Sequence, residues 1–106
     1  MKLLFIGDIV GKPGRRAEAD QINGLVRRFE IDVVVANGEN AADDGIGITP
    51  EISDELLSIV DVVTTGNHIW AHKDIIPYIA QNPRLIRPMN FPTGVPGRGW
   101  TVAETS

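Results

Sequence analysis

Three short apolar runs in the sequence each end at a glycine that precedes residue types able to bind metal ions. The three endings are Gly7-Asp8, Gly38-Glu39-Asn40 and Gly66-Asn67-His68. If the runs are parallel strands, their carboxyl ends lie at one edge of the sheet, where ligands and catalytic groups of open α/β sheets gather. Carboxylate and amide oxygens suit magnesium, calcium and manganese, and imidazole suits zinc and iron. The pattern therefore predicts a site for divalent metal ions.

Each of these residues taken alone has a simpler explanation. Asp8 could cap the turn that follows it, and His68 could be a buried histidine bonded to a backbone carbonyl. The recurrence at three equivalent positions favours a shared site instead. In such a site a carboxylate can bridge two metal ions, and bound water can lose a proton near neutral pH to attack a phosphoryl group. His68 could then protonate the departing oxygen.

The glycine-rich segment after the first run is not a Walker A phosphate loop. Its spacing is one residue short, and Pro13 stands where that loop has the Ser or Thr that binds magnesium. Basic residues near it could contact a substrate phosphate, but the solvated start of a helix explains them more simply; they are Lys12, Arg15 and Arg16. Three further polar residues are interpreted as surface residues: Asp43, Asp44 and His72.

The overall composition narrows the class of protein. The chain has 106 residues, of which 42% are hydrophobic and 23% charged, as in an ordinary globular domain. A formal net charge of −4 argues against binding to duplex nucleic acid, although a small nucleotide remains a possible partner. The lack of cysteine excludes disulfides and thiolate metal sites, and no apolar run is long enough to span a membrane. We expect a cytoplasmic protein.

Hydrophobic periodicity predicts an α/β fold that begins β-α-β-α-β with parallel strands. Strands are expected over residues 3–6, 31–36 and 60–64. The first run is fully apolar, so this strand is expected to be buried on both faces. Two further short strands are expected at residues 85–86 and 100–103.

The connections between the strands have the residues that helices and turns need. A turn over residues 11–14 should precede an amphipathic helix that reaches Phe29. Thr49, which precedes a proline, should cap a second helix. Residues 70–79 should be mostly helical, with a break or kink at Pro77 if this residue lies in the helix interior.

The three motifs together resemble those of the YmdB-like branch of the calcineurin-like metallophosphoesterases. The likeness runs from Met1 to the end of the chain and includes Gly-Lys-Pro-Gly-Arg at residues 11–15 and Pro-Gly-Arg-Gly at residues 96–99. The broader superfamily usually begins with Asp-x-His and continues with Gly-Asp. Here Val10 stands in place of that histidine and Glu39 in place of that aspartate, and both departures point to the YmdB-like branch.

The resemblance implies a fold, cofactors and roles for the site residues. The fold would be a four-layer α/β/β/α sandwich with a dinuclear iron or manganese centre. The enzyme would hydrolyse phosphodiesters, notably 2′,3′-cyclic nucleotides, by attack of a metal-bridging hydroxide. The implied roles are one metal ligand at Asp8, a bridging carboxylate at Glu39, ligands of the second metal at Asn40 and Asn67, and a catalytic histidine at His68.

Family members are considerably longer than this chain and draw further histidine ligands from their second half. These include a Gly-His-x-His motif, which His72 does not match. We therefore expect residues 1–106 to be the N-terminal part of a single metallophosphoesterase domain, to bind metal weakly and to be inactive alone. Two alternatives stay open: a phosphoprotein phosphatase of the same superfamily, and a non-catalytic α/β module that binds a nucleotide or a protein. Homo-oligomerisation also stays open.

Overall fold

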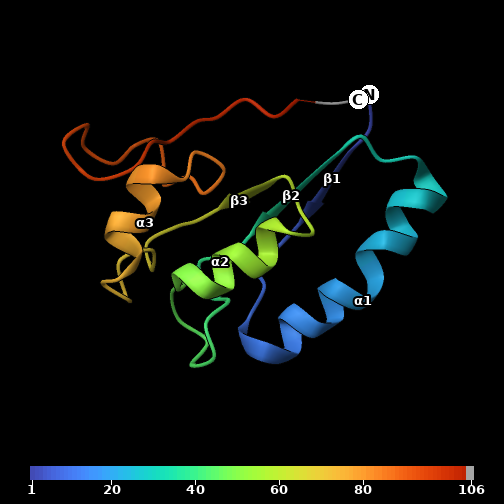
Figure 1. Ribbon diagram of the computed structural model, residues 1–106, viewed down its shortest axis with the longest axis horizontal. Coiled ribbons are helices and arrows are strands. Elements are labelled where there is room, and N and C mark those ends of the chain that lie inside the picture. Colours follow the sequence, from blue (N-terminus) through green and yellow to red (C-terminus); the bar gives the residue numbers. More distant parts are fainter. Residues whose placement is uncertain (105–106) are drawn as a thin grey trace.

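The computed structural model describes residues 1–104 and contains one three-stranded sheet and three helices (Figure 1). The strands are β1 (Leu3–Ile6), β2 (Val33–Asn37) and β3 (Val62–Thr64), and the helices are α1 (Gly11–Phe29), α2 (Pro50–Leu57) and α3 (Ile75–Gln81). β2 lies between β1 and β3 and is parallel to both. The expected β-α-β-α-β order with parallel strands is confirmed.

The register of the strands brings their carboxyl ends to the same edge of the sheet. Asn37, the last residue of β2, is paired with Thr64, the last residue of β3. Backbone hydrogen bonds continue this alignment beyond the strands: the N–H of Ile9 donates to the carbonyl of Asn37 at 3.1 Å, and the N–H of Gly38 to that of Thr64 at 2.9 Å. The three glycine-containing endings therefore leave the sheet side by side.

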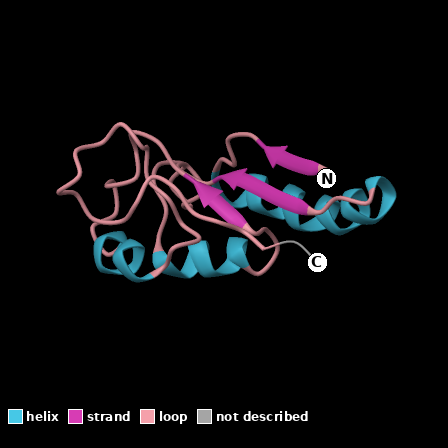
Figure 2. Cartoon of the chain, turned by 90° about the horizontal axis from the view of Figure 1, so that it is seen from above, coloured by secondary structure: helices cyan, strands magenta, loops and turns pink. Residues whose placement is uncertain are grey.

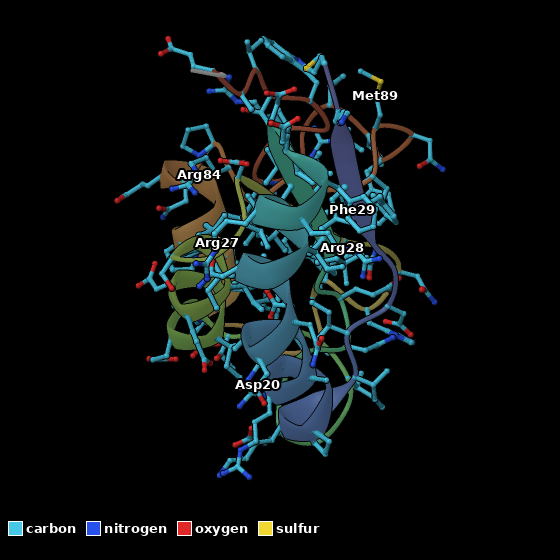
Figure 3. All side chains as sticks on the ribbon, turned by 90° about the vertical axis from the view of Figure 1, so that its right-hand side faces the viewer. Asp20, Arg27, Arg28, Phe29, Arg84 and Met89 are labelled. Carbon is cyan, nitrogen blue, oxygen red and sulfur yellow. The ribbon has the colours of Figure 1, made fainter. Side chains whose placement is uncertain are left out.

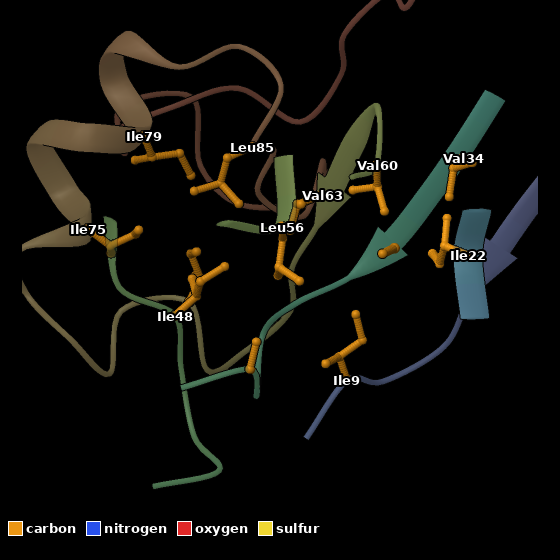
Figure 4. Packing of buried hydrophobic residues seen from close by; sticks show 13 residues of the cluster. Ile9, Ile22, Val34, Ile48, Leu56, Val60, Val63, Ile75, Ile79 and Leu85 are labelled. Atoms are coloured by element: carbon orange, nitrogen blue, oxygen red, sulfur yellow. The ribbon is translucent and has the colours of Figure 1, made fainter. Parts of the chain in front are cut away.

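The hydrophobic core lies between one face of the sheet and the helices. Right-handed crossovers between sequential parallel strands put α1 and α2 on the same side of the sheet, and Figure 2 shows both there. The most deeply buried large side chains come from the helices, β3 and the loops (Figure 4): Ile22, Ile48, Leu56, Val63, Ile69, Ile75 and Leu85. Because each such side chain stabilises the fold by roughly 1.5 to 3 kcal/mol when buried, this layer holds the strand ends in place.

Among residues 1–104, nothing covers the opposite face of β1. Side chains alternate along a strand, so Leu4 and Ile6 pack against the core while Leu3 and Phe5 point away from it and are 57% and 56% exposed. The prediction that this strand is buried on both faces is wrong, because β1 is an edge strand and the helices cover only the other side. An α/β/β/α sandwich packs a second sheet on this face, so the exposed pair is consistent with that architecture.

Two helices begin at residues other than those expected, and prolines explain both. Residues 11–14 form the first turn of α1 rather than a separate turn, and Pro13 is tolerated there because a first-turn N–H has no acceptor within the helix. Pro77 occupies the same place in α3, which starts at Ile75 rather than near Trp70. The prolines lie near helix starts and do not interrupt helices.

The remaining expectations are met in part. The hydroxyl of Thr49 accepts from the N–H of Ile52 at 3.3 Å, which confirms it as the N-cap of α2. The strand expected at residues 85–86 is not formed, because Leu85 makes only an isolated parallel bridge with Val63. Residues 100–103 form no strand, so that prediction is wrong. Trp100 is 54% exposed and Val102 79% exposed, so neither packs on an apolar layer of the described residues. Within residues 1–104, no helix combines the length and apolar character needed to cross a membrane.

One carboxyl group of α1, that of Glu18, is buried. Glu18 is 6% exposed, and neither of its carboxyl oxygens has a hydrogen-bond partner among the described residues. Burial, and then the negative charge of Glu55 on α2, raise the pKa of Glu18 from 4.5 to about 7. Between pH 4.5 and about pH 7, the Glu18 carboxyl is largely protonated in the folded protein but largely ionised in the unfolded chain. The stability of the folded protein therefore falls as the pH rises through this range.

Replacing Glu18 by Gln should stabilise the protein at pH 8 by roughly 1 to 3 kcal/mol, because the neutral amide removes the ionisation that opposes burial. The gain should be much smaller at pH 5, where the wild-type carboxyl is still protonated in the folded state. Urea unfolding followed by circular dichroism at both pH values measures the difference.

Asp20→Asn is the matched control for this change, since Asp20 is an exposed carboxylate on the same helix (Figure 3). The control should leave the pH dependence of unfolding as it is. A gain for Glu18→Gln that is equal at pH 5 and pH 8 would contradict a raised pKa.

Candidate metal centre

One amide side chain connects the ends of all three strands. Asn40, which follows β2, donates through Nδ2 to both carboxylate oxygens of Asp8, beyond β1, at 3.1 and 3.3 Å. Its Oδ1 lies 2.7 Å from Nδ1 of His68, which follows β3. The structure thus brings together three of the five side chains that the strand-end pattern expects to meet.

Glu39 joins this group through His68. Its Oε2 accepts from the backbone N–H of His68 at 3.3 Å and lies 3.7 Å from the ring Nδ1. The backbone N–H of Glu39 in turn donates to Oδ1 of Asn37 at 3.3 Å. Sequence reasoning missed Asn37 as a site residue, although a side-chain oxygen that accepts from the N–H two residues later is the mark of an Asx turn.

Gly66 makes room for the carboxylate of Glu39. A β-carbon at position 66 would lie 2.6 Å from both Cδ and Oε2 of Glu39, well inside van der Waals contact. At Gly7, the corresponding glycine after β1, a β-carbon would meet nothing within 4 Å. Gly7 and Gly66 therefore differ: of these two, Gly66 is the one that the packing of the site requires.

Asn67 is set apart from the other four predicted residues. It is exposed, and in the described part of the chain its side chain makes no hydrogen bond with them. Within residues 1–104, no three Asp, Glu or His side chains are arranged to hold a metal ion together. The donors that do converge are two carboxylates, one amide and one imidazole.

This donor set fits a hard or borderline cation in its chemistry, because it offers carboxylate and amide oxygens beside an imidazole nitrogen. The Asp8 side chain is exposed and the His68 ring is 42% exposed, so both can be approached from solvent. With Oδ1 of Asn40 as the acceptor at 2.7 Å, this contact requires the neutral tautomer that carries its proton on Nδ1, and that tautomer leaves Nε2 as an acceptor.

The loop after Asn40 is held by charged pairs. Asp43 and Asp44 are exposed, as interpreted from the sequence. The N–H of Ile46 donates to Asp44 at 3.2 Å, and this bond lowers the pKa of Asp44; His72 Nε2 lies 3.4 Å from the same oxygen. Asp43 pairs with Arg15, whose side chain is only 10% exposed. The interpretation of Arg15 as part of a solvated helix start is therefore wrong.

Gly66→Ala should displace the Glu39 carboxylate, because the new methyl group would occupy its position. The hydrogen bond from the N–H of His68 should be lost, and the protein should be destabilised by about 1 to 3 kcal/mol, as is usual for overpacking. The amide resonance of His68 in a proton–nitrogen NMR spectrum, together with urea unfolding, measures both effects.

Gly7→Ala is the control at the equivalent strand end, where there is space for a β-carbon. It should leave the His68 amide resonance and the stability nearly unchanged. If both alanine variants behave alike, Gly66 is not required for the position of Glu39.

The sequence matches the family of YmdB-like proteins over residues 4–106. It is 42% identical over its whole length to the 2′,3′-cyclic-nucleotide 2′-phosphodiesterase of Bacillus subtilis, of which it covers 40%. A crystal structure of a hypothetical protein from Thermus thermophilus is 39% identical, with a TM-score of 0.86 over 98% of this chain and 40% of that one. A crystal structure of a Mycoplasma pneumoniae protein described as a novel phosphatase is 30% identical, with a TM-score of 0.85 over 93% of this chain and 37% of that one.

The chain thus spans about two fifths of the length of these relatives. Within that span the likeness to the solved structures is close in backbone as well as in sequence. The match extends from β1 to the end of the sequence and includes all three strand endings. The chain belongs to the YmdB-like protein family and shares its α/β fold.

Proposed function

We propose that this chain is the N-terminal part of a cytoplasmic, metal-dependent phosphodiesterase that hydrolyses 2′,3′-cyclic nucleotides. The observation that carries the proposal is the convergence of Asp8, Glu39, Asn40 and His68 at one edge of the sheet. The 42% identity to a Bacillus subtilis protein named as such a phosphodiesterase supports this choice of substrate. The net charge of −4 favours a small nucleotide over duplex nucleic acid.

The residues have distinct roles in this proposal. Two metal ions, iron or manganese, would be held by Asp8, by a bridging Glu39 and by the amide oxygens of Asn40 and Asn67, together with ligands from the part of the protein that this chain does not cover. When bound, the metals polarise the phosphoryl group and lower the pKa of water. His68 would hold the proton that the leaving oxygen takes up.

Asn40 links the binding of a cation to the proton on His68. In the structure its nitrogen faces Asp8 and its oxygen faces Nδ1 of His68. If Asn40 offered its oxygen to a cation beside Asp8, its Nδ2 would face Nδ1 of His68 instead. The proton of the neutral ring would then lie on Nε2, from which it could be given to a leaving group.

His68→Ala, in the protein expressed from its whole coding sequence, should lower kcat for 2′,3′-cyclic AMP by roughly 10² to 10⁴-fold, the range for loss of a general acid. Asn67→Ala should also abolish hydrolysis, and a chelator should do the same in the wild type. His72→Gln is the matched control, because this second histidine pairs with Asp44 outside the converging group. Full turnover by His68→Ala would contradict the proposal.

The same assay distinguishes the proposed function from two other functions. The relative described as a novel phosphatase favours phosphomonoester substrates as the second candidate, so p-nitrophenyl phosphate and a phosphopeptide are tested beside the cyclic nucleotide. A non-catalytic module would bind a nucleotide with an affinity that a chelator does not change, and would hydrolyse none of the three.

The 106-residue chain alone should bind less than two metal ions and should not hydrolyse cyclic nucleotides, because the converging donors are too few to coordinate both metals. Metal content after gel filtration in manganese, measured with cyclic-nucleotide hydrolysis, tests this. Two metal ions per chain together with full turnover would show that the chain needs no further ligands.

A further inference from the structure

Arg15 on α1 makes three contacts with acceptors outside its own helix. Its guanidinium donates through one terminal nitrogen to the carbonyl of Ala41 and through the other to Asp43 Oδ1 at 2.8 Å. Its Nε lies 3.2 Å from Glu55 Oε2 on α2. With 10% of the side chain exposed and both terminal nitrogens hydrogen-bonded within the protein, Arg15 is not free to bind a substrate phosphate.

The carbonyl that Arg15 holds belongs to the residue directly after Glu39 and Asn40. Ala41 is fully buried, so its carbonyl needs a partner within the protein. The preceding carbonyl, that of Asn40, accepts from the N–H of Gly11 at 2.9 Å. Two successive carbonyls of the site loop are therefore bonded to the first two turns of α1, one by backbone and one by Arg15.

Glu18 shows how specific this arrangement is. It lies three residues after Arg15 on the same helix and is buried without a hydrogen-bond partner among the described residues. Arg15 nevertheless contacts Ala41, Asp43 and Glu55. The guanidinium is thus directed toward the site loop and α2 and makes no hydrogen bond to Glu18.

We propose that Arg15 is a positioning residue for the candidate metal centre, which holds Glu39 and Asn40 against Asp8 and His68 by clamping the carbonyl of Ala41. The reason for this role rests on the proposed function, whereas the clamp itself is a property of the folded chain. A lysine carries the charge but cannot reach three acceptors with a planar fork, so Arg15→Lys should release the loop.

The test is amide hydrogen exchange in the metal-free protein expressed from its whole coding sequence. The N–H groups of Ala41 and Ala42 are bonded to Gly38 and Gly47 and report on the loop, while that of Val63 reports on the core. Arg15→Lys should speed exchange at Ala41 and Ala42 at least 10-fold and leave Val63 unchanged. The matched control is Arg16→Lys, a change at the neighbouring residue, which should alter none of them.

A second variant distinguishes the hydrogen bond from Arg15 to the Ala41 carbonyl from the ion pair between Arg15 and Glu55 on α2. Glu55→Gln removes the charge that faces Nε but leaves the bond to Ala41, so the loop amides should stay protected. Equal exchange in Arg15→Lys and the wild type would overturn the proposal, as would loss of protection at Val63 and the loop together.

Manganese affinity, measured in the protein expressed from its whole coding sequence, connects the clamp to the site. Arg15→Lys should weaken manganese binding at least 10-fold, and Arg16→Lys should not. Unchanged affinity despite a loosened loop would overturn the positioning role. If the wild type binds no manganese at all, the proposed function fails, while the exchange data still decide whether Arg15 holds the loop.

Discussion

The candidate site depends on the common direction of three strands and on the register that keeps their ends level. β2 is bonded to both neighbours, and a slip of one residue would turn every side chain of a strand to the opposite face. Asn37 stays opposite Thr64, and the backbone bonds just beyond them extend the alignment. The amide of Asn40 can span the distance between Asp8 and His68 only because these ends do not shift.

Local sequence signals are enough to predict this part of the molecule. Apolar runs that stop at Gly7, Gly38 and Gly66 mark the strand ends within about two residues. Thr49 followed by proline marks the start of α2. Such signals work because they depend only on residues a few positions away. The direct contacts of Asn40 with Asp8 and His68, in contrast, depend on side-chain rotamers that no spacing rule contains.

The features that the sequence does not predict depend on distant segments. A run of four apolar residues in β1 looks the same whether one or two faces are covered, and the position of the helices alone decides the matter. An arginine near a helix start is usually solvated, yet Arg15 is buried because Ala41 and Asp43, 26 and 28 residues away, pack onto it. Long-range contacts of this kind leave no local pattern.

Arg15 links the charged groups around Glu18 on α1 to the geometry of the candidate site. Arg15 Nε lies 3.2 Å from Glu55, and Glu55 is also the charge that, after burial, raises the pKa of Glu18. Because this pKa is about 7, the Glu18 carboxyl is still largely protonated in mildly acidic solution. The fold thus tolerates the neutral Glu18 carboxyl of α1, while the loop after β2 stays in place. Through its bond to the Ala41 carbonyl, Arg15 supports the loop that carries Glu39 and Asn40, where ligand geometry has to be accurate.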